Sequence, residues 1–252
     1  MTFMRTIFRT DRGKVRQHNE DNGGIFINSE GVHLAIVADG MGGHRAGDVA
    51  STMTIDILKE SWQQSSHIET ANDADEWLRI HITKVNEALF KHADENSECQ
   101  GMGTTIVAAI CTEKFSTIAN IGDSRCYLFN ESGFKQVTVD HSLVNELVRT
   151  GQITKEDAEN HPRKNVLLRA LGTEIKVEMD ISTIIFEEDD ILLLCSDGLS
   201  NKLSEQEMVD IIKNEQPFEE KADSFIHLAN DNGGEDNITL VLIQYNDESA
   251  GR

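Results

Sequence analysis

Residues 34–40 have the sequence Leu-Ala-Ile-Val-Ala-Asp-Gly, an apolar strand that stops at an aspartate followed by a glycine. Residues 191–198, Ile-Leu-Leu-Leu-Cys-Ser-Asp-Gly, repeat this pattern. Both strands are apolar on both faces, so each must be covered on both sides. The pattern predicts sheets that lie in the middle of a layered fold.

The order of the expected elements favours antiparallel sheets. Successive strand-like runs between Thr104 and Val139 are separated by short turns, whereas a parallel return needs a crossover of about a dozen residues. Apolar residues at helical spacing predict helices over residues 46–63, 73–96, 143–150, 164–171, 204–213 and 218–230. No linker rich in Gly, Ser or Pro divides the chain, so we expect one α+β domain, residues 1–252, with layered antiparallel sheets flanked by helices.

The composition excludes several classes of protein. The net charge of −21 opposes binding to nucleic acid or to an anionic membrane surface. The apolar runs are much shorter than the roughly 20 residues that cross a bilayer, and the first residues lack the features of a secretory signal. We therefore expect a cytoplasmic protein. The four cysteines have no C-x-x-C spacing, and three of them lie inside apolar strand-like runs, where buried, reduced thiols are expected.

Aspartates stand at the ends of several strands. Asp39 and Asp197 each follow an apolar strand, Asp123 ends a third strand-like run, and Asp236 precedes the last one. An Asp-Gly after a strand is most often only a turn, but antiparallel neighbours end side by side, so Asp39, Asp197 and Asp236 can converge on one rim. Clustered carboxylates repel unless cations bind between them, and hard oxygen ligands suit Mg²⁺ or Mn²⁺.

Two further features extend this candidate site. The glycine after Asp39 lets the backbone approach an ion closely, so the Gly40 carbonyl is a candidate ligand. A polar loop near the N-terminus carries Arg16, Glu20 and Asp21. An arginine fork can hold two phosphate oxygens, and adjacent acids can anchor metal-bound waters. The alternative for this loop is a solvated charge cluster.

Six short motifs follow one another in register from residue 16 to residue 237. They are Arg16-x-x-Asn19-Glu20-Asp21, Val37-Ala-Asp39-Gly-Met-Gly-Gly-His44, Gly101-Met-Gly-Thr-Thr105, Asn120-Ile-Gly-Asp123-Ser-Arg125, Ser196-Asp197-Gly198 and Glu235-Asp236-Asn237. This set resembles the PPM family, the metal-dependent type 2C protein phosphatases, and most closely its short bacterial members. The resemblance implies a four-layer αββα sandwich of two packed antiparallel sheets with helices outside.

The resemblance also implies a role for each candidate ligand. Asp39 would bridge two core Mn²⁺ or Mg²⁺ ions, Asp197 and Asp236 would complete the site of the first ion, and the Gly40 carbonyl would bind the second. Glu20, supported by Asp21, would act through water, and Asp123 with Asp197 would hold a third ion. Two divalent ions lower the pKa of a shared water, so that hydroxide can attack phosphorus in line. Arg16 would hold the phosphate oxygens. No phosphoenzyme is required.

The proton donor to the leaving alkoxide remains open from the sequence. Eukaryotic relatives carry a histidine directly after the Asp-Gly, whereas this chain has Met41 there. His44 is the nearest candidate for a general acid, and His18, His141 and a metal-bound water are the alternatives.

The segment of residues 140–163 corresponds to the flap that follows the central strands in this family. We expect it to shape substrate choice, so that exchanging residues 145–163 with a relative's changes preference among phosphoproteins but not turnover of a small aryl phosphate. The expected protein is a monomer that dephosphorylates serine and threonine in proteins and opposes a cognate Ser/Thr kinase. The alternatives are a non-catalytic phosphoprotein-binding regulator on the same fold and a hydrolase of small phosphate esters.

Overall fold

The strands of the computed structural model, which describes residues 2–43 and 46–247, form two antiparallel sheets. The first sheet has the order β1 (Thr2–Asp11), β11 (Ile238–Asp247), β10 (Ile191–Cys195), β7 (Arg125–Asn130) and β8 (Gly133–Gln136). The second has the order β2 (Asp21–Ile27), β3 (His33–Met41), β5 (Ile106–Cys111), β6 (Phe115–Ile121) and β9 (Asp180–Ile185), with the short β4 (Gly103–Thr104) paired to β3.

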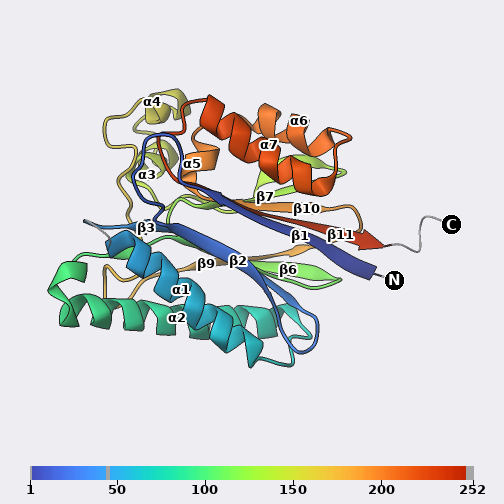
Figure 1. The fold of residues 1–252 in the computed structure, drawn as a ribbon, viewed down its shortest axis with the longest axis horizontal. Helices are drawn as coiled ribbons and strands as arrows, with labels where there is room; N and C mark the ends of the chain where they lie inside the picture. Colours follow the sequence, from blue (N-terminus) through green and yellow to red (C-terminus); the bar gives the residue numbers. More distant parts are fainter. Residues whose placement is uncertain (1, 44–45, 248–252) are drawn as a thin grey trace.

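Helices cover the outer face of each sheet, which gives the four layers seen in Figure 1. The long helices α1 (Ala46–Gln63) and α2 (Ala71–Glu95) cover the second sheet, and α6 (Glu205–Lys213) and α7 (Phe218–Asp231) cover the first. The short helices are η1 (Ser97–Cys99), α3 (Leu143–Arg149), α4 (Lys155–Glu159) and α5 (Asp197–Ser200). The last three lie at one end of the sandwich, beside the loop between β1 and β2.

Three separate apolar clusters hold these layers together. Along β3, Leu34 and Ile36 face the cluster under α1 and α2, whereas Ala35 and Val37 face the cluster between the two sheets. Strand β10 alternates in the same way between the inter-sheet cluster and the cluster under α6 and α7. Because successive side chains of a strand point to opposite faces, a strand between two layers must be apolar at every position. The prediction of buried strands in a layered α+β fold is confirmed.

Most predicted helices are found, and one is absent. Helix α1 has the predicted bounds, and Ser204 caps α6 in the predicted capping box with Glu207. The helix predicted over residues 164–171 is wrong: Leu167 and Leu171 form isolated bridges to Ser142 and Thr104. The backbone groups of this segment therefore bond to β4 and to the residue before α3, and this tertiary pairing overrides helical periodicity.

No helix within residues 2–43 and 46–247 is both long and apolar enough to cross a membrane.

Candidate active site

The candidate ligands gather at the end of the sandwich where the flap and α5 lie (Figure 1). Pairing of β10 with β11 puts Cys195 opposite Leu240, so Asp197 and Asp236 leave these two strands side by side. Asp39 belongs to the other sheet and pairs with Asp21 on β2. Strand pairing thus accounts for the first two aspartates, and the packing of sheet on sheet brings Asp39 to them.

The carboxylates are close enough to change one another's ionisation. Burial raises the pKa of Asp39 well above its ordinary value, and repulsion from Asp21, Asp197, Asp123 and Asp236 raises it further. Burial followed by repulsion from Asp236 raises the pKa of Asp197, and a hydrogen bond from Asp39 partly offsets this. These groups therefore lie in one electrostatically coupled cluster. Ionising several of its carboxyl groups at once is unfavourable, because the charges are buried and repel one another.

Two supporting carboxylates are perturbed in the same direction. Burial raises the pKa of Asp21 to about 7, against hydrogen bonds from Ser196 and Thr239 that lower it. Burial and repulsion from Asp197 and Asp140 raise the pKa of Asp123 to about 7, against the attraction of Arg125. Without cations, both carboxyls would be partly protonated near neutral pH.

The N-terminal loop contributes Arg16 and Glu20. Nη2 of Arg16 lies 2.8 Å from Oδ2 of Asp236, and the Arg16 side chain keeps 52% of its surface exposed. Burial raises the pKa of Glu20, and the charge of Arg16 lowers it. Glu20 also reaches the first turn of α1, where a Cβ on Gly47 would lie 2.8 Å from its Oε2. The predicted phosphate-binding arginine thus stands at the edge of the carboxylate cluster.

Asn237 ties this loop to the first sheet. Its Nδ2 donates to the carbonyl oxygens of Arg12 and His18 at 2.9 Å each, and its Oδ1 accepts from the backbone N–H of Glu20 at 2.8 Å. The residue itself is 5% exposed. Asn237 was not predicted to have a role of its own, although its position directly after the candidate ligand Asp236 was the available signal.

Two buried hydroxyl groups connect the carboxylates to the sheets, and the sequence did not single them out. Oγ of Ser196 donates to Oδ2 of Asp21 at 2.7 Å and accepts from the N–H of Thr239 at 3.0 Å. Oγ1 of Thr105 accepts from the N–H of Asp39 at 3.0 Å and lies 2.7 Å from Oγ of Ser124. Asp21 and the backbone of Asp39 are therefore each held by a buried hydroxyl group.

Gly40 is required by close packing of the backbone. A Cβ at this position would lie 2.2 Å from the Gly47 carbonyl oxygen and 2.5 Å from that of Glu20. The N–H of Gly40 also donates to the Glu20 carbonyl at 3.2 Å. A side chain here would push apart β3, the N-terminal loop and α1. The structure thus gives a steric reason for this glycine, next to the close approach to an ion that the sequence suggested.

The three histidines proposed as proton donors have different surroundings. His44 lies outside the described residues. The His18 carbonyl accepts from Asn237, which holds the His18 backbone in the loop beside Glu20. His141 is buried, its Nδ1 accepts from the N–H of Gly122 at 3.2 Å, and its Nε2 lies 3.1 Å from Oδ2 of Asp180. Both ring nitrogens of His141 are thus engaged in structural contacts, which is a poor arrangement for a general acid.

The donors of this cluster suit hard divalent cations. Among residues 2–43 and 46–247, no three His, Cys, Asp or Glu side chains stand as a ready-made metal site. The carboxylates nevertheless supply oxygen ligands only, and each has either a pKa raised by burial and by its neighbours or an ion pair to Arg16. Oxygen ligands with excess negative charge are what Mg²⁺ and Mn²⁺ prefer, so the residues fit such ions.

Comparison with known proteins gives one consistent result. The family model for Protein phosphatase 2C matches residues 10–242. A serine/threonine phosphatase, stp, of Listeria welshimeri is 53% identical over 249 residues, which cover 99% of each chain. The crystal structure of the serine/threonine phosphatase Stp1 of Staphylococcus aureus superposes with a TM-score of 0.92 at 42% identity, covering 96% of this chain and 95% of that one.

A third relative was solved with metal. The catalytic domain of the serine/threonine protein phosphatase PstP, in complex with two manganese ions, superposes with a TM-score of 0.86 at 32% identity, covering 98% of this chain and all of that one. The fold and the site thus define a protein phosphatase of the metal-dependent class. The chain belongs to the protein phosphatase 2C family and is a serine/threonine protein phosphatase of that type. The alternative of a non-catalytic regulator on the same fold is thereby set aside.

Proposed function

We propose that the chain removes phosphate from phosphoserine and phosphothreonine in proteins at the carboxylate cluster, with two core Mn²⁺ or Mg²⁺ ions and a third. Asp39, Asp197, Asp236 and the Gly40 carbonyl would hold the core ions, Glu20 with Asp21 would act through water, and Asp123 with Asp197 would hold the third. Such ions lower the pKa of a bound water and place positive charge opposite the phosphate. The observation that carries this proposal is the buried, mutually repelling set of carboxylates around Asp39.

The chain's own residues then orient the substrate. The exposed guanidinium of Arg16 carries five N–H donors, so its contact with Asp236 leaves donors for two phosphate oxygens. Asn237 and Thr105 hold the backbone on either side of the cluster and keep its carboxylates in place. In phosphoryl transfer, positioning and charge stabilisation make up most of what a protein supplies.

We infer that His44 gives a proton to the leaving alkoxide, because both ring nitrogens of His141 are held by structural contacts and His44 lies nearest in sequence to Asp39 and Gly40. His44→Gln should then lower kcat for a phosphothreonine peptide much more than for a small aryl phosphate, whose leaving group departs without a proton. Equal losses on both substrates would overturn this assignment.

The proposal extends to the setting of the reaction. The expected substrates are phosphorylated proteins, among them a cognate Ser/Thr kinase and its targets, and the protein is expected to act in the cytosol as a monomeric domain. The four cysteines are buried and unpaired, as suits a reducing compartment.

The proposal is tested by measuring the turnover of a phosphothreonine peptide and of a small aryl phosphate. Each substrate is assayed with Mn²⁺, with chelator, and with the variant Asp39→Asn. Activity on both substrates should disappear in chelator. With Mn²⁺ present, Asp39→Asn should lose more than the roughly 10- to 100-fold that removal of a supporting residue costs. Circular dichroism checks that the variant is folded. Full activity in chelator would overturn the proposal.

A further inference from the structure

A cavity of about 700 Å³ opens beside Asp123 and Asp197. Its other walls come from the flap, which contributes Lys155, and from the loop between α5 and α6, which contributes Lys202. The volume lies within the roughly 300–1,000 Å³ of ligand pockets. Because the cavity touches two of the proposed metal ligands, whatever occupies it lies next to the reacting phosphate.

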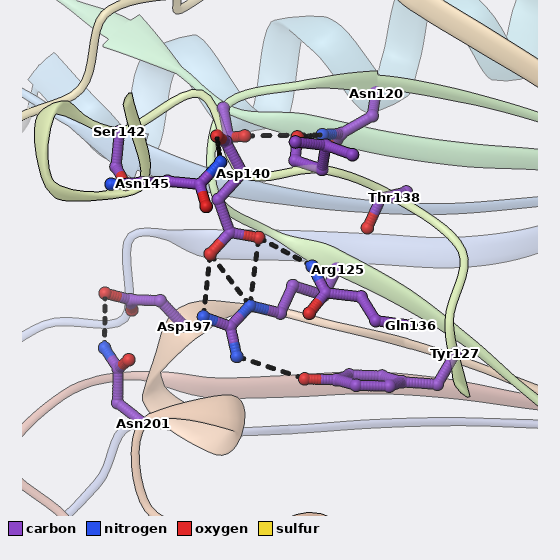
Figure 2. Close-up of polar contacts among 12 residues, drawn as sticks. Asn120, Arg125, Tyr127, Gln136, Thr138, Asp140, Ser142, Asn145, Asp197 and Asn201 are labelled. Carbon is purple, nitrogen blue, oxygen red and sulfur yellow. Dashed lines mark hydrogen bonds and ion pairs between the residues drawn. The ribbon is translucent and has the colours of Figure 1, made fainter. Parts of the chain in front are cut away.

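One wall of the cavity is a fixed ion pair, drawn in Figure 2. Nε of Arg125 lies 3.0 Å from both carboxylate oxygens of Asp140, its Nη2 lies 2.7 Å from Oδ2, and its Nη1 donates to the Tyr127 hydroxyl at 3.1 Å. Gln136 donates to the same carboxylate at 2.8 Å. The charge of Arg125 is thus neutralised and its guanidinium is held in place, so this arginine does not serve a ligand.

The other cations on the cavity differ in how far they are engaged. Lys202 forms an ion pair with Glu235. Lys155 and Lys164 are exposed, and neither forms an ion pair with another residue among those the structure describes. The pKa of Glu235 is lowered chiefly by Lys202 and in part by Lys164, which places Lys164 near that pair. Two ammonium groups at the cavity are therefore available to a ligand.

Because the protein as a whole is strongly negative, these two lysines matter for attracting an anionic ligand to the cavity. The chain carries a net charge of −21, which repels an anionic substrate at long range. Within about a Debye length, roughly 8–10 Å at physiological salt, local charges decide the interaction. The cavity is also lined by hydrogen-bonding side chains such as Ser142, Asn145 and Asn165, which suit a polypeptide with a polar sequence.

We propose that the cavity binds the stretch of polypeptide next to the phosphoserine or phosphothreonine, and that Lys155 and Lys164 select a second anionic group on that stretch. The group is a second phosphate or a carboxylate, since both offer acceptor oxygens to an ammonium. This inference rests on the proposed function and names the substrate class for the same site: phosphoproteins with clustered negative charge.

Three peptides that differ in a single position test the inference, with the full chain and Mn²⁺. Each carries one phosphothreonine in a neutral sequence, and a position within four residues on either side is alanine, glutamate or phosphoserine. The unaltered protein should show a kcat/KM about three- to tenfold higher for the two charged peptides, as two partly exposed ion pairs allow. The glutamate and phosphoserine peptides separate a carboxylate from a phosphate as the preferred group.

Matched variants locate the effect. Lys155→Ala with Lys164→Ala should abolish the preference and leave the neutral peptide and a small aryl phosphate unchanged, and Lys155→Glu with Lys164→Glu should reverse it. The control is Lys84→Ala with Lys91→Ala on α2, which removes the same charge from an exposed helix face elsewhere. This control should keep the preference.

The outcomes separate the two proposals. If the unaltered protein turns over all three peptides equally, or if the control variant loses the preference as much as the cavity variant does, this inference is wrong and the proposed function stands. If no phosphopeptide is turned over with Mn²⁺, both fail.

Discussion

The carboxylate rim, which is the cluster of Asp39, Asp123, Asp197 and Asp236 with the residues that hold it, lies next to the flap of residues 140–163. The rim is fixed by buried hydrogen bonds, whereas the flap is not. At the rim, Thr105, Ser196 and Asn237 are at most 5% exposed, and each ties a candidate ligand to a sheet. In the flap, α3 has no buried residue, and α4 is five residues long and capped by its own Thr154. The flap is fixed mainly at its base, where Asn145 donates to the Asp140 carbonyl at 2.7 Å.

This difference suggests a division of labour. Regions with few buried apolar contacts open at a lower free energy than buried strands, so the flap can adapt where the rim cannot. Catalytic groups need to be held within a fraction of an ångström, which buried hydrogen bonds supply. We therefore expect rim substitutions to affect every substrate and flap substitutions to affect only those substrates that reach the flap.

The largest contrast should come from two asparagines changed in the same way. Asn237→Ala removes three hydrogen bonds and leaves the Glu20 N–H and two carbonyl oxygens without this partner. We expect a loss of about 2–4 kcal/mol in the free energy of unfolding, and about 10- to 100-fold lower activity on a peptide and on a small aryl phosphate alike. Denaturant unfolding and steady-state kinetics with Mn²⁺ measure the two effects.

Asn145→Ala is the matched change in the flap. It removes one side-chain hydrogen bond at the flap base, so the free energy of unfolding should fall by about 0.5–1.5 kcal/mol. Turnover of the aryl phosphate should stay within about twofold of the unaltered protein. Similar losses of aryl phosphate turnover in both variants would mean that the rim and the flap are not held differently.

The fold was predictable where one strand has to satisfy two layers. Leu34 to Ala38 and Ile191 to Cys195 are apolar at every position, and this pattern alone requires cover on both faces. The segment 164–171 misled because its leucines have helical spacing, while its backbone pairs with Ser142 and Thr104. Such pairing depends on residues distant in the chain, which local periodicity does not contain.

The site was predictable only in part. Asp197 and Asp236 could be placed together because they leave neighbouring antiparallel strands. The same argument was extended to Asp39, but Asp39 lies in the other sheet and reaches the cluster through the packing of sheet on sheet, which strand pairing does not predict. Thr105 and Asn237 stood in the quoted motifs, but their function depends on partners far along the chain, which no spacing rule reveals.

A change of pH should have an effect of intermediate size on the stability of the metal-free protein. In the folded protein the pKa of Asp123 is raised to about 7, against an ordinary value of 3.8. The folded state therefore holds this proton more tightly than the unfolded state, and its stabilising contribution, complete below about pH 4, is lost as the pH rises through about 7. In chelator, the melting temperature should therefore fall by a few degrees between pH 5 and pH 8, since each kcal/mol lost from the free energy of unfolding lowers it by about 2–4 °C.

The variant Asp123→Asn and added Mn²⁺ assign this pH dependence to the rim. The variant lacks the titrating group, so its melting temperature in chelator should fall less over the same pH range. Mn²⁺ should stabilise the unaltered protein more at pH 8 than at pH 5, because the ions compete with protons for the same oxygens. Parallel curves for the variant and the unaltered protein would remove Asp123 from the explanation.

The smallest effect should come from the flap, and the structure improves the exchange that tests it. A graft of residues 145–163 would cut α3 and replace Asn145, so it would disturb the flap base as well as its tip. A graft of residues 150–163 from the Staphylococcus aureus relative keeps α3 and replaces the loop, α4 and Lys155. Preference among phosphoproteins should change several-fold, while kcat for a small aryl phosphate stays constant, because the latter does not extend beyond the rim. A matching change in aryl phosphate turnover would show that the tip acts on the rim, and the division between the two regions would then be wrong.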